Sequence, residues 1–204
     1  MTVSELCDAS HSGLDLDGQV WAGAEMSEMT LEDTSMRRLR ATGGRWGQCV
    51  LIDCDLEGAD LAGLTARDCS VLNSRLDRSR LTGSAWLRGR WRGIDAEDVQ
   101  ADQLTAFESS WRQVTLRRWR LQEADFTGAQ WHRVHLIDCD LTGARFSGLQ
   151  ASAVRLEGCT LAAAQGIEAL RGASLGYSTA VTALPAMASH LGIDIHHDQE
   201  EMDR

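Results

Sequence analysis

Lysine is absent from the 204-residue chain, so all 20 of its basic residues are arginines. Proline occurs once, which excludes a proline-rich linker or stalk. No run approaches the roughly 18 apolar residues that a membrane span needs, and the acidic N-terminus lacks the apolar segment of a signal peptide. We therefore expect a cytoplasmic protein of one domain, with a small appendage at most, and no membrane association.

Acidic residues outnumber basic ones, and the formal net charge is −10. Phosphate contacts require an excess of basic side chains, so this balance argues against direct binding of nucleic acid. Hydrophobic residues make up 43% and charged residues 25%, which is typical of an ordered globular chain.

A five-residue period dominates the sequence. Every fifth residue from Leu16 to Leu161 is apolar, 30 positions in all, and chance would produce this with a probability of about 10⁻¹¹. The same frame covers 32 pentapeptides from Ser4 to Ala163 without an insertion, and only His11 breaks the rule. A period of five is neither helical nor that of a plain strand. It predicts a chain that turns a corner every five residues, so that four sides close one coil of 20.

The residue two before each apolar centre also points inward, and it is usually Ala, Cys, Gly or Ser. Large and small residues compensate: Leu39 precedes Ala41, whereas Ser109 precedes Trp111. Close packing requires such a conserved pair volume. All seven tryptophans occupy inward positions. Three of them, one coil apart, are expected to stack: Trp91, Trp111 and Trp131.

The best-formed units read ADLAG at Ala59–Gly63, ADFTG at Ala124–Gly128 and CDLTG at Cys139–Gly143. They resemble the A-(D/N)-(L/F)-x-G consensus of the pentapeptide-repeat family, over about four-fifths of the chain. The resemblance implies an all-β solenoid, a right-handed quadrilateral β-helix of about eight coils. With ~4.8 Å between stacked strands, the rod would be ~38 Å long.

The rod should be closed by a short C-terminal helical cap. The frame breaks after Ala163, and Ala169–Leu175 reads as a last coil shifted by one residue. We expect four parts: an N-terminal cap with degenerate first repeats (1–13), the pentapeptide-repeat β-helix (14–176), a helix (177–195) and a disordered acidic tail (196–204).

Ser178 is a candidate N-cap of that helix, Gly192 is a helix stop, and Pro185 should kink or split it. Such a helix resembles the dimerisation cap of the gyrase-protecting, Qnr-type members of the family, which implies a homodimer. A plain cap on a monomer is the alternative. The candidate dimer interface comprises Tyr177, Val181, Leu184, Met187, Ala188 and Leu191.

No motif points to catalysis, a metal or a cofactor. Asp53–Gly58 imitates the start of an EF-hand loop, but its twelfth position would be Leu64 instead of glutamate. His132 and His135 lack a third ligand, and His196-His197 would bind metal at most weakly. No nucleotide-binding loop or nucleophile elbow occurs. We therefore expect no enzyme, no metal and no cofactor.

The six cysteines contain no CxxC motif, and five of them occupy the small inward position. Two pairs are one coil apart, Cys49 with Cys69 and Cys139 with Cys159, at a spacing within disulfide range. Their parallel Cβ directions disfavour a bond, so free buried thiols are expected.

Outward positions define candidate interaction surfaces of two kinds, acidic and apolar. The acidic interaction column comprises Asp55, Glu57, Asp77, Asp95, Glu97 and Asp98. Another side is basic, with Arg90, Arg92, Arg112 and Arg133. Two apolar patches are expected where Ile52 stacks with Leu72 and Leu87 stacks with Phe107. The charge is uneven: residues 1–33 carry −8, residues 34–163 carry +2 and residues 164–204 carry −4.

Two functional hypotheses follow, one from the family resemblance and one from the surfaces. The resemblance implies a non-catalytic DNA mimic that binds a type II topoisomerase, DNA gyrase or topoisomerase IV, and modulates it or protects it from quinolone-like inhibitors. The alternative is a general protein–protein interaction scaffold with a different partner. The uninterrupted rod and its helix favour the first, whereas the neutral body, which lacks a continuous acidic stripe, suits the second equally.

Overall fold

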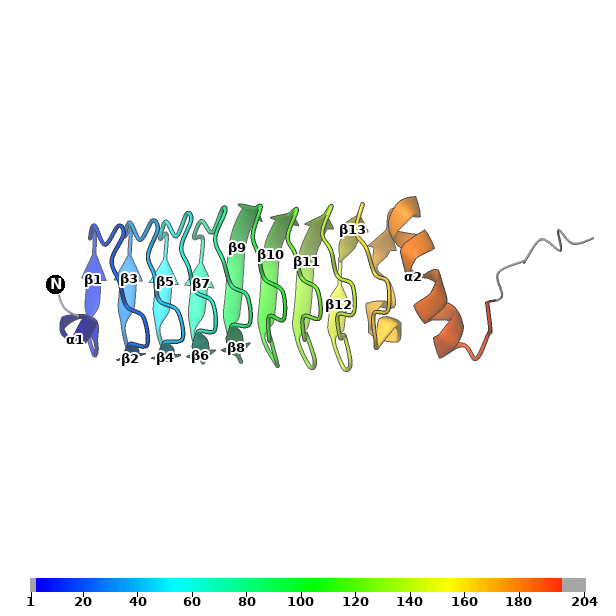
Figure 1. Ribbon diagram of the computed structural model, residues 1–204, viewed down its shortest axis with the longest axis horizontal. Coiled ribbons are helices and arrows are strands. Elements are labelled where there is room, and N and C mark those ends of the chain that lie inside the picture. The colour runs from blue at the N-terminus through cyan, green and yellow to red at the C-terminus, as the bar shows by residue number, and fades with distance from the viewer. Residues whose placement is uncertain (1–2, 196–204) are drawn as a thin grey trace, which may run out of the picture.

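The computed structural model describes residues 3–195 as a rod of stacked coils with a helix across its C-terminal end (Figure 1). It confirms the predicted fold, a right-handed quadrilateral β-helix of about eight coils with a C-terminal helix. The expected acidic tail, 196–204, lies outside the described residues. Within residues 3–195, no helix is long and apolar enough to cross a membrane.

Most of the strands have only three residues, while three strands of eight continue around a corner. In chain order the elements are α1 (Val3–Leu6), β1 (Ser10–Ser12), β2 (Glu25–Ser27), β3 (Thr30–Glu32), β4 (Arg45–Gly47), β5 (Val50–Ile52), β6 (Thr65–Arg67), β7 (Ser70–Leu72), β8 (Ala85–Leu87), β9 (Arg90–Glu97), β10 (Ser110–Arg117), β11 (Gln130–Ile137), β12 (Gln150–Ser152), β13 (Arg155–Glu157), the 3₁₀ helix η1 (Ile167–Leu170), β14 (Ser174–Leu175) and α2 (Tyr177–His190).

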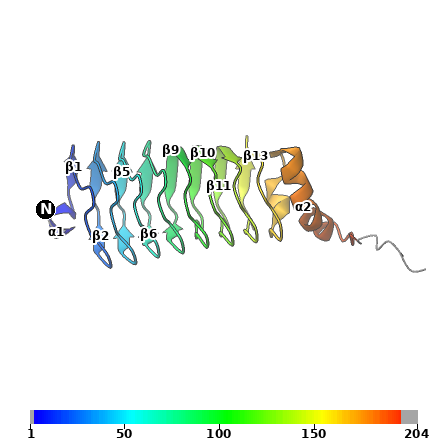
Figure 2. The ribbon, with the colours of Figure 1, turned by 45° about the horizontal axis from the view of Figure 1, so that its top comes forward.

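The strands pair in parallel across successive coils (Figure 2). One sheet has ten strands in the order β1-β3-β5-β7-β9-β10-β11-β13-β14, with β12 also paired to β11, and a second has the order β2-β4-β6-β8. The register is one coil of 20 residues, so Trp91 pairs with Trp111 and Trp111 with Trp131. Single bridges such as Asp60 with Arg80 join the remaining sides.

Each corner is formed by a residue with positive φ. This residue is the last of every pentapeptide from Asp8 to Ala163, and it explains the glycine of the consensus. At Gly158 a Cβ would also clash with the Asp138 carboxylate one coil below. The consensus aspartate has its own role at the corner, because its carboxylate accepts the N–H two residues later, at 3.1 Å from Ala62 to Asp60.

The core is a column of inward side chains with stacked aromatic rings. Trp111 is fully buried, and its ring centroid lies 5.4 Å from that of Trp91, at 21°, and 6.0 Å from that of Trp131, at 38°. The Trp111 Nε1–H donates to the Ser109 hydroxyl at 2.9 Å. The predicted tryptophan column is therefore confirmed, and the small partner residue also serves as a hydrogen-bond acceptor.

The last coil shows the predicted shift of one residue. Leu156 pairs with Leu175, which is 19 residues further along the chain instead of 20. η1 and β14 belong to this shortened coil, and α2 follows directly after Gly176.

α2 differs from the prediction in three respects. Its N-cap is Gly176, not Ser178, because the Gly176 N–H still donates to the Leu156 carbonyl at 2.8 Å and keeps that residue extended. Pro185 lies inside the helix without splitting it. The helix ends at His190, short of the expected residue 195, because Gly192 has a φ of 70° and the Ile193 N–H donates back to the Ala188 carbonyl at 2.8 Å.

Two threonines of α2 cap the open end of the rod. The Cys159 N–H donates to the Thr179 hydroxyl at 2.8 Å, and the Leu161 N–H donates to the Thr182 hydroxyl at 3.0 Å. In the body of the rod, the next coil supplies such an acceptor: the Cys54 N–H donates to the Ser74 hydroxyl, 20 residues further along the chain. At the end of the rod, the threonines take this role. The helix thus satisfies the exposed backbone and ends the stack.

Candidate functional site

The outward side chains form straight columns along the rod, because residues 20 apart occupy equivalent places. We number the four sides as faces. Face 1 carries β1, β3, β5, β7, β12 and the first three residues of β9, β10 and β11, and face 2 carries the last three residues of β9, β10 and β11. Face 4 carries β2, β4, β6 and β8, opposite to face 2, and face 3 lies between them.

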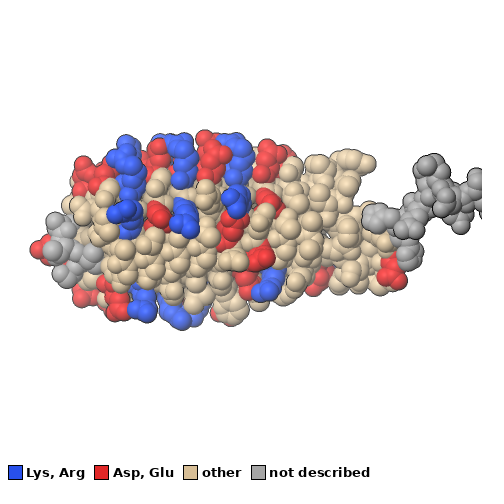
Figure 3. Space-filling view, viewed as in Figure 1, with Lys and Arg blue, Asp and Glu red and all other residues tan. Residues whose placement is uncertain are grey.

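The acidic column lies on face 2, and every one of its carboxylates is ion-paired. The partners are Arg37 for Asp55, Arg78 for Glu57, Arg75 for Asp77, Arg117 for Asp95, and Arg118 for both Glu97 and Asp98. The N–O distance is 2.7 Å for the Asp55, Glu97 and Asp98 pairs. Red and blue side chains accordingly alternate along the upper edge of the rod in Figure 3.

Within this column, Arg118 and Asp98 shift the pKa of each other. Hydrogen bonds from Arg118 hold the pKa of the Asp98 carboxyl below its usual value. The same contacts, with Asp98 first and Glu97 second, raise the pKa of Arg118. The column therefore presents alternating charges on successive coils instead of an uncompensated acidic stripe.

The two apolar pairs stack as the spacing predicts. Ile52 pairs in register with Leu72 on face 1, and the Phe107 carbonyl accepts the Arg88 N–H beside Leu87 on face 4. Phe107 is 37% exposed, and the other three are half-buried. The exposed apolar area is consequently small at both places.

The basic side lies on face 1 and at the corner between faces 1 and 2. Its four arginines, Arg90, Arg92, Arg112 and Arg133, are exposed, and among the described residues none of their guanidinium groups has a carboxylate within 4.0 Å. Arg92 and Arg112 stand in one column directly above Leu72 and Ile52. These four positions are each 20 residues apart, so the sequence already implies that the two arginines continue the column of Ile52 and Leu72. We did not predict this alignment.

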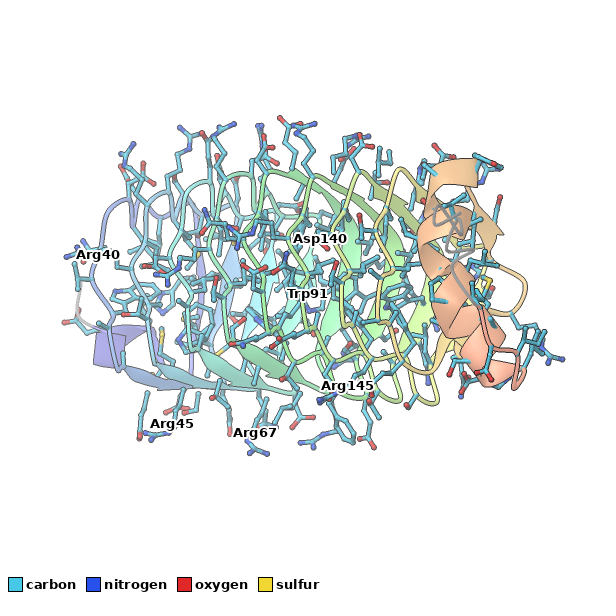
Figure 4. The ribbon with its side chains drawn as sticks, turned by 45° about the vertical axis from the view of Figure 1, so that its right-hand side comes forward. Arg40, Arg45, Arg67, Trp91, Asp140 and Arg145 are labelled. Carbon is cyan, nitrogen blue, oxygen red and sulfur yellow. The ribbon has the colours of Figure 1, made fainter. Side chains whose placement is uncertain are left out.

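Two hollows adjoin one another on this side. One, of about 470 Å³, is lined by Val50, Leu72, Arg90, Arg92 and Arg112, with Trp91 below them. The other, of about 260 Å³, is lined by Arg92, Arg112, Gln113, His132 and Arg133. Figure 4 shows Trp91 inside the coil.

The expected dimer interface on α2 is only partly exposed. Tyr177, Val181 and Leu184 are 88%, 53% and 53% exposed, and Leu191 is exposed as well. Met187 packs instead against the core, and Ala188 is buried where the chain turns back after Gly192. The rod-facing side of α2 is formed by Thr179 and Ala183.

Cys49, Cys54, Cys69, Cys139 and Cys159 are buried free thiols, and Cys7 is half-buried. Burial raises the pKa of the Cys54 thiol to about 11, so this group stays protonated at neutral pH. Within residues 3–195, no three His, Cys, Asp or Glu side chains are arranged to hold a metal ion.

Comparison with known families and structures places these features in context. Eight copies of the unit described as "Pentapeptide repeats" match residues 47–83 and 120–162. A search of curated proteins gives no match.

Solved structures similar to this chain include QnrB1, HetL and Rfr23, of which the last two are pentapeptide repeat proteins. QnrB1, a plasmid-mediated fluoroquinolone resistance protein, is 17% identical with a TM-score of 0.43, over 91% of this chain and 100% of QnrB1. HetL, involved in heterocyst differentiation regulation in the cyanobacterium Nostoc sp. strain PCC 7120, is 19% identical with a TM-score of 0.32, over 84% and 82%. Rfr23 from the cyanobacterium Cyanothece 51142 is 12% identical with a TM-score of 0.33, over 66% and 89%.

Proposed function

Because the chain is a pentapeptide-repeat protein, we propose that it works through its outer faces, as a non-catalytic rod that binds another protein. The inward side chains from Leu16 to Leu161 are packed in the core of the rod and are not exposed to a ligand. What remains for recognition is a rigid surface on which side chains recur at fixed intervals, and such a surface suits a protein partner.

The observation that carries this choice is the pairing of the acidic column with arginines on face 2. A protein that mimics DNA has to offer negative charge that a DNA-binding saddle can attract. On face 2 the arginines already compensate each carboxylate, so the field that a topoisomerase would sense is weak. A partner other than a DNA-binding enzyme is therefore favoured.

Modulation of DNA gyrase or topoisomerase IV is the second candidate. It is favoured by the rod shape and by the net charge of −8 over residues 1–33, where no basic residue occurs. In this case the first two coils, instead of face 2, would provide the negative surface. Protection from quinolone-like inhibitors would then follow from occupancy of the DNA-binding site.

A gyrase assay separates the two candidates. We expect micromolar protein to leave both supercoiling and fluoroquinolone-induced cleavage unchanged, and the variant with Glu57, Asp77 and Glu97 all replaced by Arg to behave the same way. Inhibition or drug rescue by the wild-type protein, with either gyrase or topoisomerase IV, would decide for the second candidate. Affinity capture from a lysate of the source cells tests the first candidate, a protein partner other than a DNA-binding enzyme. We expect the wild-type protein and the triple variant to recover the same partner.

We further propose that α2 joins two copies of the chain through Tyr177, Val181 and Leu184, which project from the end of the rod. We expect the wild-type protein to sediment as a dimer at micromolar concentration and Leu184→Asp to sediment as a monomer. Ser178→Asp, a change at an exposed polar position on the same helix, should remain dimeric. A monomeric wild type would make α2 a plain cap.

A further inference from the structure

The arginine side of the rod stands out because, among the described residues, none of its guanidinium groups forms an ion pair. Ten other arginines of the described chain lie within 4.0 Å of a carboxylate: Arg37, Arg38, Arg45, Arg75, Arg78, Arg80, Arg88, Arg117, Arg118 and Arg120. The four arginines Arg90, Arg92, Arg112 and Arg133, which we call the arginine face, have no such partner among the residues described.

Position distinguishes the arginine face from the other unpaired arginines. Arg40, Arg67 and Arg145 are spread over faces 3 and 4, and Figure 4 shows them apart from one another. Arg155 lies on face 2, and Arg171 directly follows η1. The arginine face, by contrast, gathers its charges within three successive coils, since Arg92 pairs in register with Arg112 and Arg112 with His132. Like charges this close repel one another, and a bound anion would relieve that repulsion.

The two hollows beside these arginines differ in chemistry. The smaller hollow, about 260 Å³, is lined only by polar side chains, among them Arg92, Arg112 and Arg133. The larger one, about 470 Å³, shares Arg92 and Arg112 but has Val50 and Leu72 on its other wall. A ligand that fills both needs negative groups next to an aliphatic group.

We propose that the arginine face docks an acidic segment of a partner protein, in which Asp or Glu side chains flank an aliphatic residue. Guanidinium groups bind carboxylates in bidentate geometry, and they hold them in the smaller hollow and along Arg90. The aliphatic side chain packs against Leu72 and Val50. This inference rests on the proposed function, for which it names the chemistry of the partner.

A protein segment fits this surface better than a nucleic acid does. A nucleic acid needs a basic field several phosphates long, whereas the column of Arg92 and Arg112 runs through Leu72 and Ile52 to Glu32 within three further coils. The charge of −8 over residues 1–33 repels a long polyanion from the N-terminal part of the rod. A short acidic segment avoids this repulsion because it contacts the arginine face alone.

Fluorescence anisotropy with the full-length chain tests the proposal. The probe is a fluorescein-labelled peptide of about ten residues in which two leucines are flanked by Asp and Glu, an extended length that spans several coils. We expect micromolar binding at low salt, weakened at least tenfold by Arg92→Glu with Arg112→Glu. The matched control, Arg40→Glu with Arg145→Glu, changes the net charge equally and should bind within twofold of wild type.

Three results would overturn the proposal: no binding of the acidic peptide at low salt, equal losses in the arginine-face and control variants, or tighter binding of a single-stranded DNA of matched charge. Circular dichroism establishes that the variants fold. If the glutamate variant does not, Arg92→Gln with Arg112→Gln gives the same comparison. The peptide assay requires no natural partner. A negative result would exclude the arginine face as a docking site for acidic segments, and the gyrase and capture experiments would still decide the proposed function.

Discussion

Replacing Trp111 with alanine should lower the free energy of unfolding by about 3–5 kcal/mol. The Trp111 ring is fully buried between Trp91 and Trp131, and it also contacts Phe126 edge-on at a centroid distance of 5.6 Å. Alanine would leave a cavity that the rigid coils above and below cannot close. Urea unfolding followed by far-UV circular dichroism measures the loss.

Val20→Ala is the matched control for this experiment, because Val20 is an apolar side chain that is 56% exposed. We expect it to change the free energy of unfolding by less than about 0.5 kcal/mol. A loss below about 1 kcal/mol for Trp111→Ala would contradict the stacked column, since it would mean that the coils relax around the missing ring.

Thr179→Val should cost about 1–3 kcal/mol, although valine has nearly the same shape. The Thr179 side chain is completely buried, and its hydroxyl accepts the Cys159 N–H at 2.8 Å. Valine leaves that N–H buried without an acceptor at the end of the stack. Hydrogen exchange should accelerate at Cys159, together with a lower midpoint of urea unfolding.

Thr42→Val provides the comparison, because Thr42 is a half-buried threonine at a corner in the N-terminal third of the rod. It should leave both the midpoint and the exchange at Cys159 unchanged. Equal effects of the two substitutions would show that replacing threonine with valine is unfavourable irrespective of position, and that the Thr179 hydroxyl has no special part in capping the rod.

Most of the fold could be predicted from the sequence because one spacing determines both the coil and the core. Apolar centres five apart require a corner in every pentapeptide, and the volumes at Ser109 and Trp111 already indicate which side chains share a layer. The shifted last coil was also readable, since the frame visibly breaks after Ala163. These features depend on the spacing and size of residues along the chain, which can be read from the sequence alone.

The surfaces were harder to predict because they depend on where long side chains reach. The sequence places Glu57, Asp77 and Glu97 in one column, but only the structure shows Arg78, Arg75 and Arg118 reaching them. On α2, a helical periodicity cannot tell that Ala188 is covered by the chain returning after Gly192. Likewise, Ser178 is a residue type that favours the N-cap, but the hydrogen bond from the Gly176 N–H to the Leu156 carbonyl determines where the helix begins.

The register of 20 residues also constrains how such a protein can change in evolution. A duplication or deletion of one whole coil within the body preserves every pairing, as between Trp91, Trp111 and Trp131, and alters the length by one strand spacing of ~4.8 Å. An insertion in the body that is not a multiple of five moves apolar centres to the surface, whereas one of five, ten or fifteen residues keeps them inward but shifts every later residue to another face. The 19-residue step and the two threonines of α2 close the C-terminal end to growth. Within the body, a gene for this rod can therefore lengthen it with every column preserved only in units of sixty nucleotides.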